Sequence, residues 1–110
     1  MTAPFHPLLL CLMRELCEAD EAFRVSTGQQ WSEANQWVQG VGNTFSREQM
    51  DRAVTYGAAC REMALYLTIF PVEGIDSEAY KQAAQMGAVA RQRLAQDIAR
   101  QAIELYRGMK

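Results

Sequence analysis

Apolar residues near the N-terminus recur every three or four positions, which is the period of one face of an α-helix. The pattern predicts a first helix from about Pro7 to Ser26. Pro7 is well placed in the first helical turn, because N–H groups there have no acceptor within the helix. Gly28 can adopt the left-handed conformation that often follows the last residue of a helix. Residues 1–6 are expected to form a mobile arm. The predicted core stripe is Leu9, Leu12, Leu16, Ala19 and Phe23, with Phe5 extending it backwards.

The middle of the chain predicts a short helix at about residues 31–38 and a long one after Ser46. Ser46 and Gln49 have the spacing of a capping box, in which each side chain bonds the other residue's backbone N–H. Pro71 should end the long helix, because the residue before proline avoids the α region. Its core stripe is expected at Met50, Ala53, Gly57, Cys60, Ala64 and Leu67. A second apolar stripe lies beside it at Val54, Ala58, Leu65 and Ile69.

A last helix is predicted from Asp76, as N-cap, to about Tyr106, with Ile75 and Tyr80 placed for a hydrophobic staple. Its apolar stripe is Ala79, Ala83, Met86, Ala90, Leu94, Ile98, Ala102 and Leu105. No segment alternates with period two, so no strand is expected. The predicted fold is therefore all-α: one domain over residues 1–110, a small bundle of three main helices plus one short helix.

Composition narrows the function classes. The chain has 110 residues, 49% of them hydrophobic and 22% charged, which is typical of a globular domain. The net charge of −2 argues against binding nucleic acid, whose phosphates need a basic surface. Acidic residues gather in the first helix and basic ones in the last. These two helices are expected to lie near each other, within one protomer or across a dimer.

The three cysteines and the longest apolar run indicate a cytoplasmic protein. The odd count and apolar neighbours of Cys11, Cys17 and Cys60 favour reduced, buried thiols. The run from Leu8 to Met13 is too short to cross a membrane and has no cationic region before it. Neither a secretory signal nor a membrane partner is expected.

No constellation of residues predicts an enzyme, a metal site or a cofactor. His6 is the only histidine and precedes the first helix, away from any nucleophile and orienting group. Glu15 and Glu18, beside Asp20 and Glu21, are interpreted as a solvated helix face, with an acidic contact patch as the alternative. The last helix repeats arginines seven residues apart, but acidic residues alternate with them and favour a salt-bridged solvent face over a nucleic-acid stripe. These residues are Arg93, Asp97, Arg100, Glu104 and Arg107.

The chain has more apolar residues than the predicted core stripes account for. This excess indicates a binding surface, because exposed apolar patches mark interfaces. The first helix is apolar nearly all round at its start, as is residue range 65–72. The predicted homodimer interface combines that start with a small-residue face of the last helix: Leu8, Leu10, Cys11, Ala83, Gly87 and Ala90. The predicted partner-binding residues are Tyr66, Ile69, Phe70, Val72 and Trp37. The alternative for residues 66–72 is that they close the end of the bundle.

The layout resembles a known family. Length, acidic pI, four predicted helices and an apolar third helix ended by proline are similar to the QslA family, small bacterial anti-activators of the LuxR-type quorum-sensing receptor LasR. The opening Met1-Thr2-Ala3-Pro4-Phe5-His6-Pro7, leading into Leu8 to Met13, adds to this resemblance. It implies a homodimer that binds the receptor's ligand-binding domain and blocks receptor dimerisation, which keeps the receptor off promoter DNA. The resemblance carries no diagnostic motif, so it assigns no site residue.

The sequence thus predicts a non-enzymatic, protein-binding regulator that masks an interface of its partner. A phage-type inhibitor or a small secretion chaperone is the alternative, with a different protein partner. A nucleic-acid-binding or enzymatic helical bundle is the third hypothesis.

Overall fold

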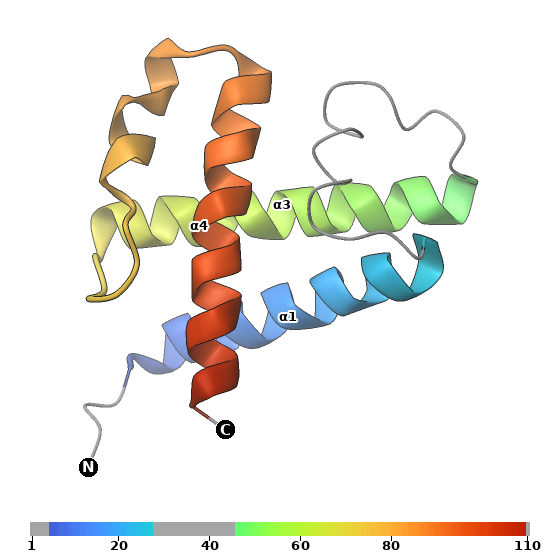
Figure 1. Ribbon diagram of the computed structural model, residues 1–110, viewed down its shortest axis with the longest axis horizontal. Coiled ribbons are helices and arrows are strands. Elements are labelled where there is room, and N and C mark those ends of the chain that lie inside the picture. The colour runs from blue at the N-terminus through green and yellow to red at the C-terminus, as the bar shows by residue number, and fades with distance from the viewer. Residues whose placement is uncertain (1–4, 28–45, 110) are drawn as a thin grey trace.

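The computed structural model describes residues 5–27 and 46–109 (Figure 1). They form helix α1 (Pro7–Thr27), helix α3 (Arg47–Ile69), the 3-10 helix η1 (Glu78–Gln85) and helix α4 (Ala88–Gly108). These two ranges contain no strand, which confirms the prediction of an all-α fold. The predicted short helix at residues 31–38, the cap at Gly28 and Trp37 lie outside the described residues.

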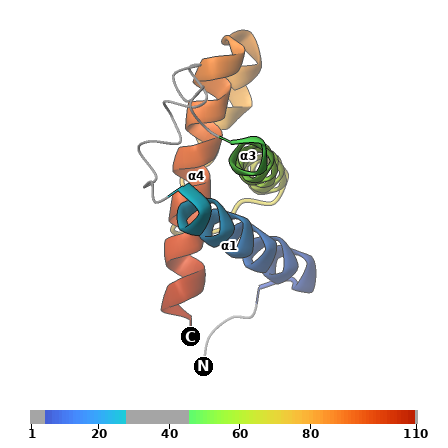
Figure 2. The same cartoon turned by 90° about the vertical axis from the view of Figure 1, so that its right-hand side faces the viewer.

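The helices stack in two layers. Helices α1 and α3 run antiparallel, side by side, and α4 crosses one face of both (Figures 1 and 2). Element η1 lies beside the first half of α4. The shortest dimension, between Cα atoms, is 18 Å, against 46 and 34 Å for the other two. Packed helix axes lie about 8–10 Å apart, so 18 Å leaves room for two layers of helices. The face of the α1–α3 pair opposite α4 is therefore not covered by any described helix.

Helix α1 buries a stripe slightly rotated from the predicted one. Met13 is fully buried, whereas Leu12 and Ala19 are only half-buried. Since α1 packs against α3 and α4 together, the face between those two helices becomes the core face. The stripe that is buried is Leu9, Met13, Leu16, Asp20 and Phe23.

Helix α3 begins and ends as predicted. The Ser46 hydroxyl accepts a hydrogen bond from the Gln49 backbone N–H (3.2 Å), and the Ser46 N–H donates to the Gln49 side chain (2.8 Å), which confirms the capping box. The core stripe is confirmed from Ala53 to Leu67, and Met50 is half-buried. The second stripe lies outside the core and is exposed at every position: Val54, Ala58, Leu65 and Ile69.

The prediction of one continuous last helix from residue 76 to 106 is wrong. The chain forms η1, turns through Met86 and Gly87 in extended conformation, and only then begins α4. Glycine is about 1 kcal/mol less favourable than alanine inside a helix, so Gly87 is a weak point of such a helix. The turn lets η1 pack back on α4 and buries Ala83. Asp76 accepts a hydrogen bond from the Glu78 N–H (3.2 Å), but Ser77 holds the N-cap position of η1.

Two buried polar side chains, which the apolar pattern did not predict, fix how α4 sits on the other helices. Asp20 accepts a hydrogen bond from Arg24 Nε (3.1 Å) and lies 3.6 Å from the Arg107 guanidinium. The contact between Asp20 and Arg107 confirms that the acidic first helix lies near the basic last helix within one protomer.

The second buried polar side chain is Gln92, which accepts a hydrogen bond from Arg61 (2.5 Å) and donates one to the Gly57 carbonyl (3.3 Å). A Cβ at Gly57 would lie 3.3 Å from Gln92 Nε2, so glycine gives α4 its close approach.

Candidate protein-binding site

An apolar pocket lies where the start of α1 meets the end of α3. Antiparallel packing brings these two ends together although about 60 residues separate them in sequence. The pocket has a volume of about 500 Å³. We call it the end pocket; its lining consists of Phe5, His6, Leu8, Leu9, Tyr66, Phe70, Pro71 and Val72.

Large apolar side chains are exposed at the end pocket. Phe70 is 58% exposed and Leu8 is 51% exposed; Ile69, next to Phe70 in the chain, is 61% exposed. The ring of Phe70 lies against that of Tyr66, with centroids 5.2 Å apart and planes tilted by 40°. Tyr66 is half-buried and packs on the core. Phe70 is thus held from one side by an anchored aromatic ring and is open to solvent on the other.

Hydrogen bonds fix the backbone around the end pocket. The Phe70 N–H donates to the Tyr66 carbonyl (2.8 Å) and closes the last turn of α3. His6 Nδ1 accepts from the Leu8 N–H (3.0 Å) and caps the start of α1. Phe5 packs on the core, so residues 5 and 6 are part of the fold, while residues 1–4 lie outside the described residues.

The structure brings most of the predicted partner-binding residues together. Tyr66, Phe70 and Val72 all line the end pocket, whereas Ile69 is exposed and does not line it. The exposure of Phe70 differs from that expected of a residue that closes the bundle. Leu8, assigned from sequence to a dimer interface, lines the same pocket.

The predicted dimer residues of the small-residue face do not form one surface with Leu8. Leu10 and Cys11 are half-buried. Ala83 is 1% exposed, so it has no surface to offer a second chain, because η1 folds back on α4. Gly87 is exposed and lies in the η1–α4 turn, and Ala90 is half-buried in the first turn of α4; both are far from the start of α1 (Figure 1).

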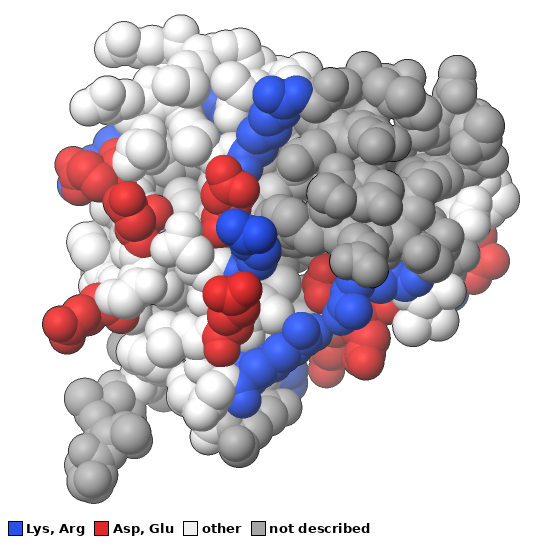
Figure 3. Space-filling model, viewed as in Figure 1, with Lys and Arg blue, Asp and Glu red and all other residues white. Residues whose placement is uncertain are grey.

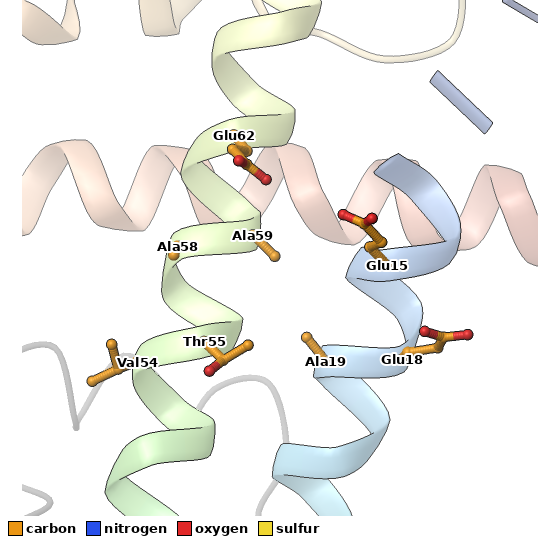
Figure 4. Close-up of a pocket in the computed structure, with 8 residues that line it drawn as sticks. All are labelled: Glu15, Glu18, Ala19, Val54, Thr55, Ala58, Ala59 and Glu62. Atoms are coloured by element: carbon orange, nitrogen blue, oxygen red, sulfur yellow. The ribbon is translucent and has the colours of Figure 1, made fainter. Parts of the chain in front are cut away.

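Sequence reasoning missed a second hollow, which lies between α1 and α3 on the face opposite α4 (Figure 4). Ala19 and Ala59 point toward each other between the two helices, and Glu15 and Glu62 extend toward each other across the gap. The exposed second stripe of α3 was the available signal, because Val54 and Ala58 belong to it. We call this hollow the α1–α3 groove; it is lined by Glu15, Glu18, Ala19, Val54, Thr55, Ala58, Ala59 and Glu62.

The charged side chains of α4 are exposed, and the Cys60 thiol is buried. Charges of both signs alternate along the exposed face of α4 (Figure 3), as the sequence predicted. Burial raises the pKa of the Cys60 thiol to about 12, so this thiol is neutral and a poor nucleophile. Cys11 and Cys17 are half-buried. Across residues 5–27 and 46–109, no group of three histidine, cysteine, aspartate or glutamate side chains could hold a metal ion.

Comparisons with known proteins give no match: no family model, no curated protein and no solved structure matches this chain. The resemblance to QslA-type anti-activators therefore stays a prediction. None of the described helices is long and apolar enough to cross a membrane.

Proposed function

We propose that this chain is a non-enzymatic regulator that binds another protein through the end pocket and covers an interface of that partner. One observation carries the proposal: Leu8 and Phe70 are each more than half exposed and line a single apolar pocket. Exposed apolar side chains scattered singly are common, but a contiguous group around a concave surface is typical of a binding site.

The aromatic pair is suited to anchor a partner. Phe70 rests on Tyr66, which the core holds in place, so little conformational freedom of these rings is left to lose on binding. Aromatic anchors in desolvated pockets dominate binding free energy at protein interfaces. A partner that inserts an apolar side chain into the end pocket would desolvate Phe70 and Leu8 together.

The resemblance suggests which protein the partner is. By analogy with QslA-type anti-activators, we propose the ligand-binding domain of a LuxR-type receptor in the cytoplasm, whose dimerisation this chain would block. An apolar docking surface supports this role, because dimer interfaces are themselves apolar. A phage-type inhibitor or a secretion chaperone would use the same pocket with a different partner.

Replacing Phe70 by alanine is expected to weaken partner binding about thirtyfold, since losing an interface anchor often costs about 2 kcal/mol. The partner is isolated by pull-down from native lysate, and its affinity for the two proteins is then measured by calorimetry. A purified LuxR-type ligand-binding domain is tested in parallel.

Val25→Ala is the matched control, because Val25 is 76% exposed and does not line the end pocket. Its affinity should stay within about twofold of the unmodified protein, as for a residue outside the interface. Equal affinities of the Phe70→Ala and unmodified proteins would show that the end pocket is not the binding site.

We also propose that the chain forms a homodimer through Leu8 at the end pocket. Sedimentation velocity at micromolar concentration should give a dimer, and Leu8→Glu should shift it to a monomer because a charge would be buried in an apolar contact. Leu8 is exposed in the protomer, so the variant should keep its fold. A monomeric unmodified protein under these conditions would contradict the homodimer and leave the pocket to the heterologous partner.

A further inference from the structure

The α1–α3 groove is a second surface without a described partner, and it goes beyond the proposed function. Its volume is about 620 Å³, and alanine side chains form the part between the helices. It belongs to the face opposite α4, which no described helix covers (Figures 2 and 4). Two antiparallel helices with small facing residues leave a groove into which the ridge of a third helix fits.

The walls of the groove are acidic. Glu15, Glu18 and Glu62 line it, all three are exposed, and the lining contains no lysine, arginine or histidine. Glu15 and Glu62 extend toward each other from opposite helices (Figure 4). The Cys11 thiol donates to Glu15 at 3.7 Å, a contact that leaves the carboxylate charge in place. Like charges across a groove repel, and a cation placed between them relieves that repulsion.

We infer that the α1–α3 groove binds an amphipathic helix of another protein, with small apolar residues on its inner face and lysine or arginine along both flanks. The alanines accept the inner face, and Glu15 and Glu62 pair with the flanking cations. The lining spans residues 54–62 of α3, about 12 Å along a helix axis, so about two turns of the bound helix are in contact. Helix-in-groove binding of this kind is a common mode of recognition.

Charge argues against the two other occupants. A second copy of this chain docked groove to groove would bring its own Glu15 and Glu62 into the same contact, and like-charge contacts disfavour association. The segment at residues 28–45 contains Glu33 and no lysine or arginine, so it cannot supply the complementary charge. A separate basic helix satisfies both the shape and the charge of the groove.

The test uses a fluorescein-labelled helical peptide of about 18 residues, long enough to be helical on its own, with alanine and leucine on one face and lysines along its flanks. Fluorescence anisotropy measures its affinity for the full chain at low salt. Glu15→Gln with Glu62→Gln is expected to weaken binding roughly fivefold or more, as for the loss of two partly exposed ion pairs. A peptide with the same apolar face and glutamate flanks should not bind.

Glu73→Gln with Glu104→Gln is the matched control, because both residues are exposed and lie outside the groove. This double substitution changes the net charge by the same amount as Glu15→Gln with Glu62→Gln. This variant should bind the lysine peptide as the unmodified protein does. Equal weakening by both double variants would reveal general charge attraction and overturn the inference, as would binding of the glutamate peptide or no binding of either peptide.

The experiment also separates the groove from the end pocket and from self-association. Phe70→Ala should bind the lysine peptide normally, and loss of peptide binding in that variant would place the peptide at the end pocket and overturn the inference. Sedimentation of the Glu15→Gln, Glu62→Gln variant completes the test. If removing these charges raised the oligomeric state above that of the unmodified protein, the occupant would be a second copy, and the assignment to a basic helix would be wrong.

Discussion

Replacing Phe23 by alanine is expected to lower the free energy of unfolding by about 3–5 kcal/mol, the usual cost of removing a buried aromatic ring. Phe23 is 2% exposed, and its ring stacks on that of Tyr56 with centroids 5.7 Å apart. The substitution leaves a cavity between α1 and α3, the two helices that make the most extensive contact in the fold. Urea denaturation followed by circular dichroism measures the loss.

Phe70→Ala provides the comparison, because it is the same chemical change at a residue that is 58% exposed. We expect it to cost less than about 1 kcal/mol of stability, as most surface substitutions do. A loss as large as that of Phe23→Ala would make Phe70 a core residue and would remove the main support for the end pocket as a binding site.

Stability is expected to fall steeply in alkaline solution because the Cys60 thiol is buried. Its pKa rises from 9.0 to about 12 in the folded chain, chiefly by desolvation. Between these values the unfolded chain releases the thiol proton and the folded chain keeps it, so a rise in pH favours unfolding. The free energy of unfolding should keep its full value below pH 9. At pH 11, two pH units above the unfolded pKa, it should be lower by about 3 kcal/mol.

Tyr56 acts in the same direction at higher pH. Burial also raises the pKa of its hydroxyl, so unfolding is further favoured once the unfolded tyrosine ionises above pH 10. Urea denaturation at intervals from pH 8 to pH 11 measures the combined effect.

Cys60→Ala should flatten the pH dependence between pH 9 and 10, where the thiol titrates before the tyrosine. Cys11→Ala, at a half-buried cysteine, should retain the dependence of the unmodified protein. An unchanged slope in Cys60→Ala would mean that this thiol does not cause the alkaline loss.

The helix boundaries that local chemistry fixes were predictable from sequence. The capping box at Ser46 and Gln49 and the stop before Pro71 depend on residues within one turn of each other, and α3 begins and ends there. The break at Gly87 was missed because a single glycine costs only about 1 kcal/mol in a helix. Packing of η1 against α4, a contact between two separate elements, decides between the continuous and the broken form.

The candidate site was partly predictable. The apolar surplus at residues 65–72 pointed to Tyr66, Phe70 and Val72, and all three line the end pocket. Sequence periodicity could not assign Leu8 to the same pocket, because the assignment requires the antiparallel pairing of α1 with α3. It could not show that Asp20 is buried either, since its partner Arg107 is distant in sequence.

The amino-acid sequence alone predicts that the chain is helical, where α3 begins and ends, and which stripe of α3 faces the core. These properties depend on residue spacing and on capping within a turn. Which apolar residues are exposed depends on how the helices pack, because α4 covers one face of the α1–α3 pair and no described helix covers the other. The end pocket and the α1–α3 groove both result from that arrangement, because each is formed by side chains that only the pairing of α1 with α3 brings together.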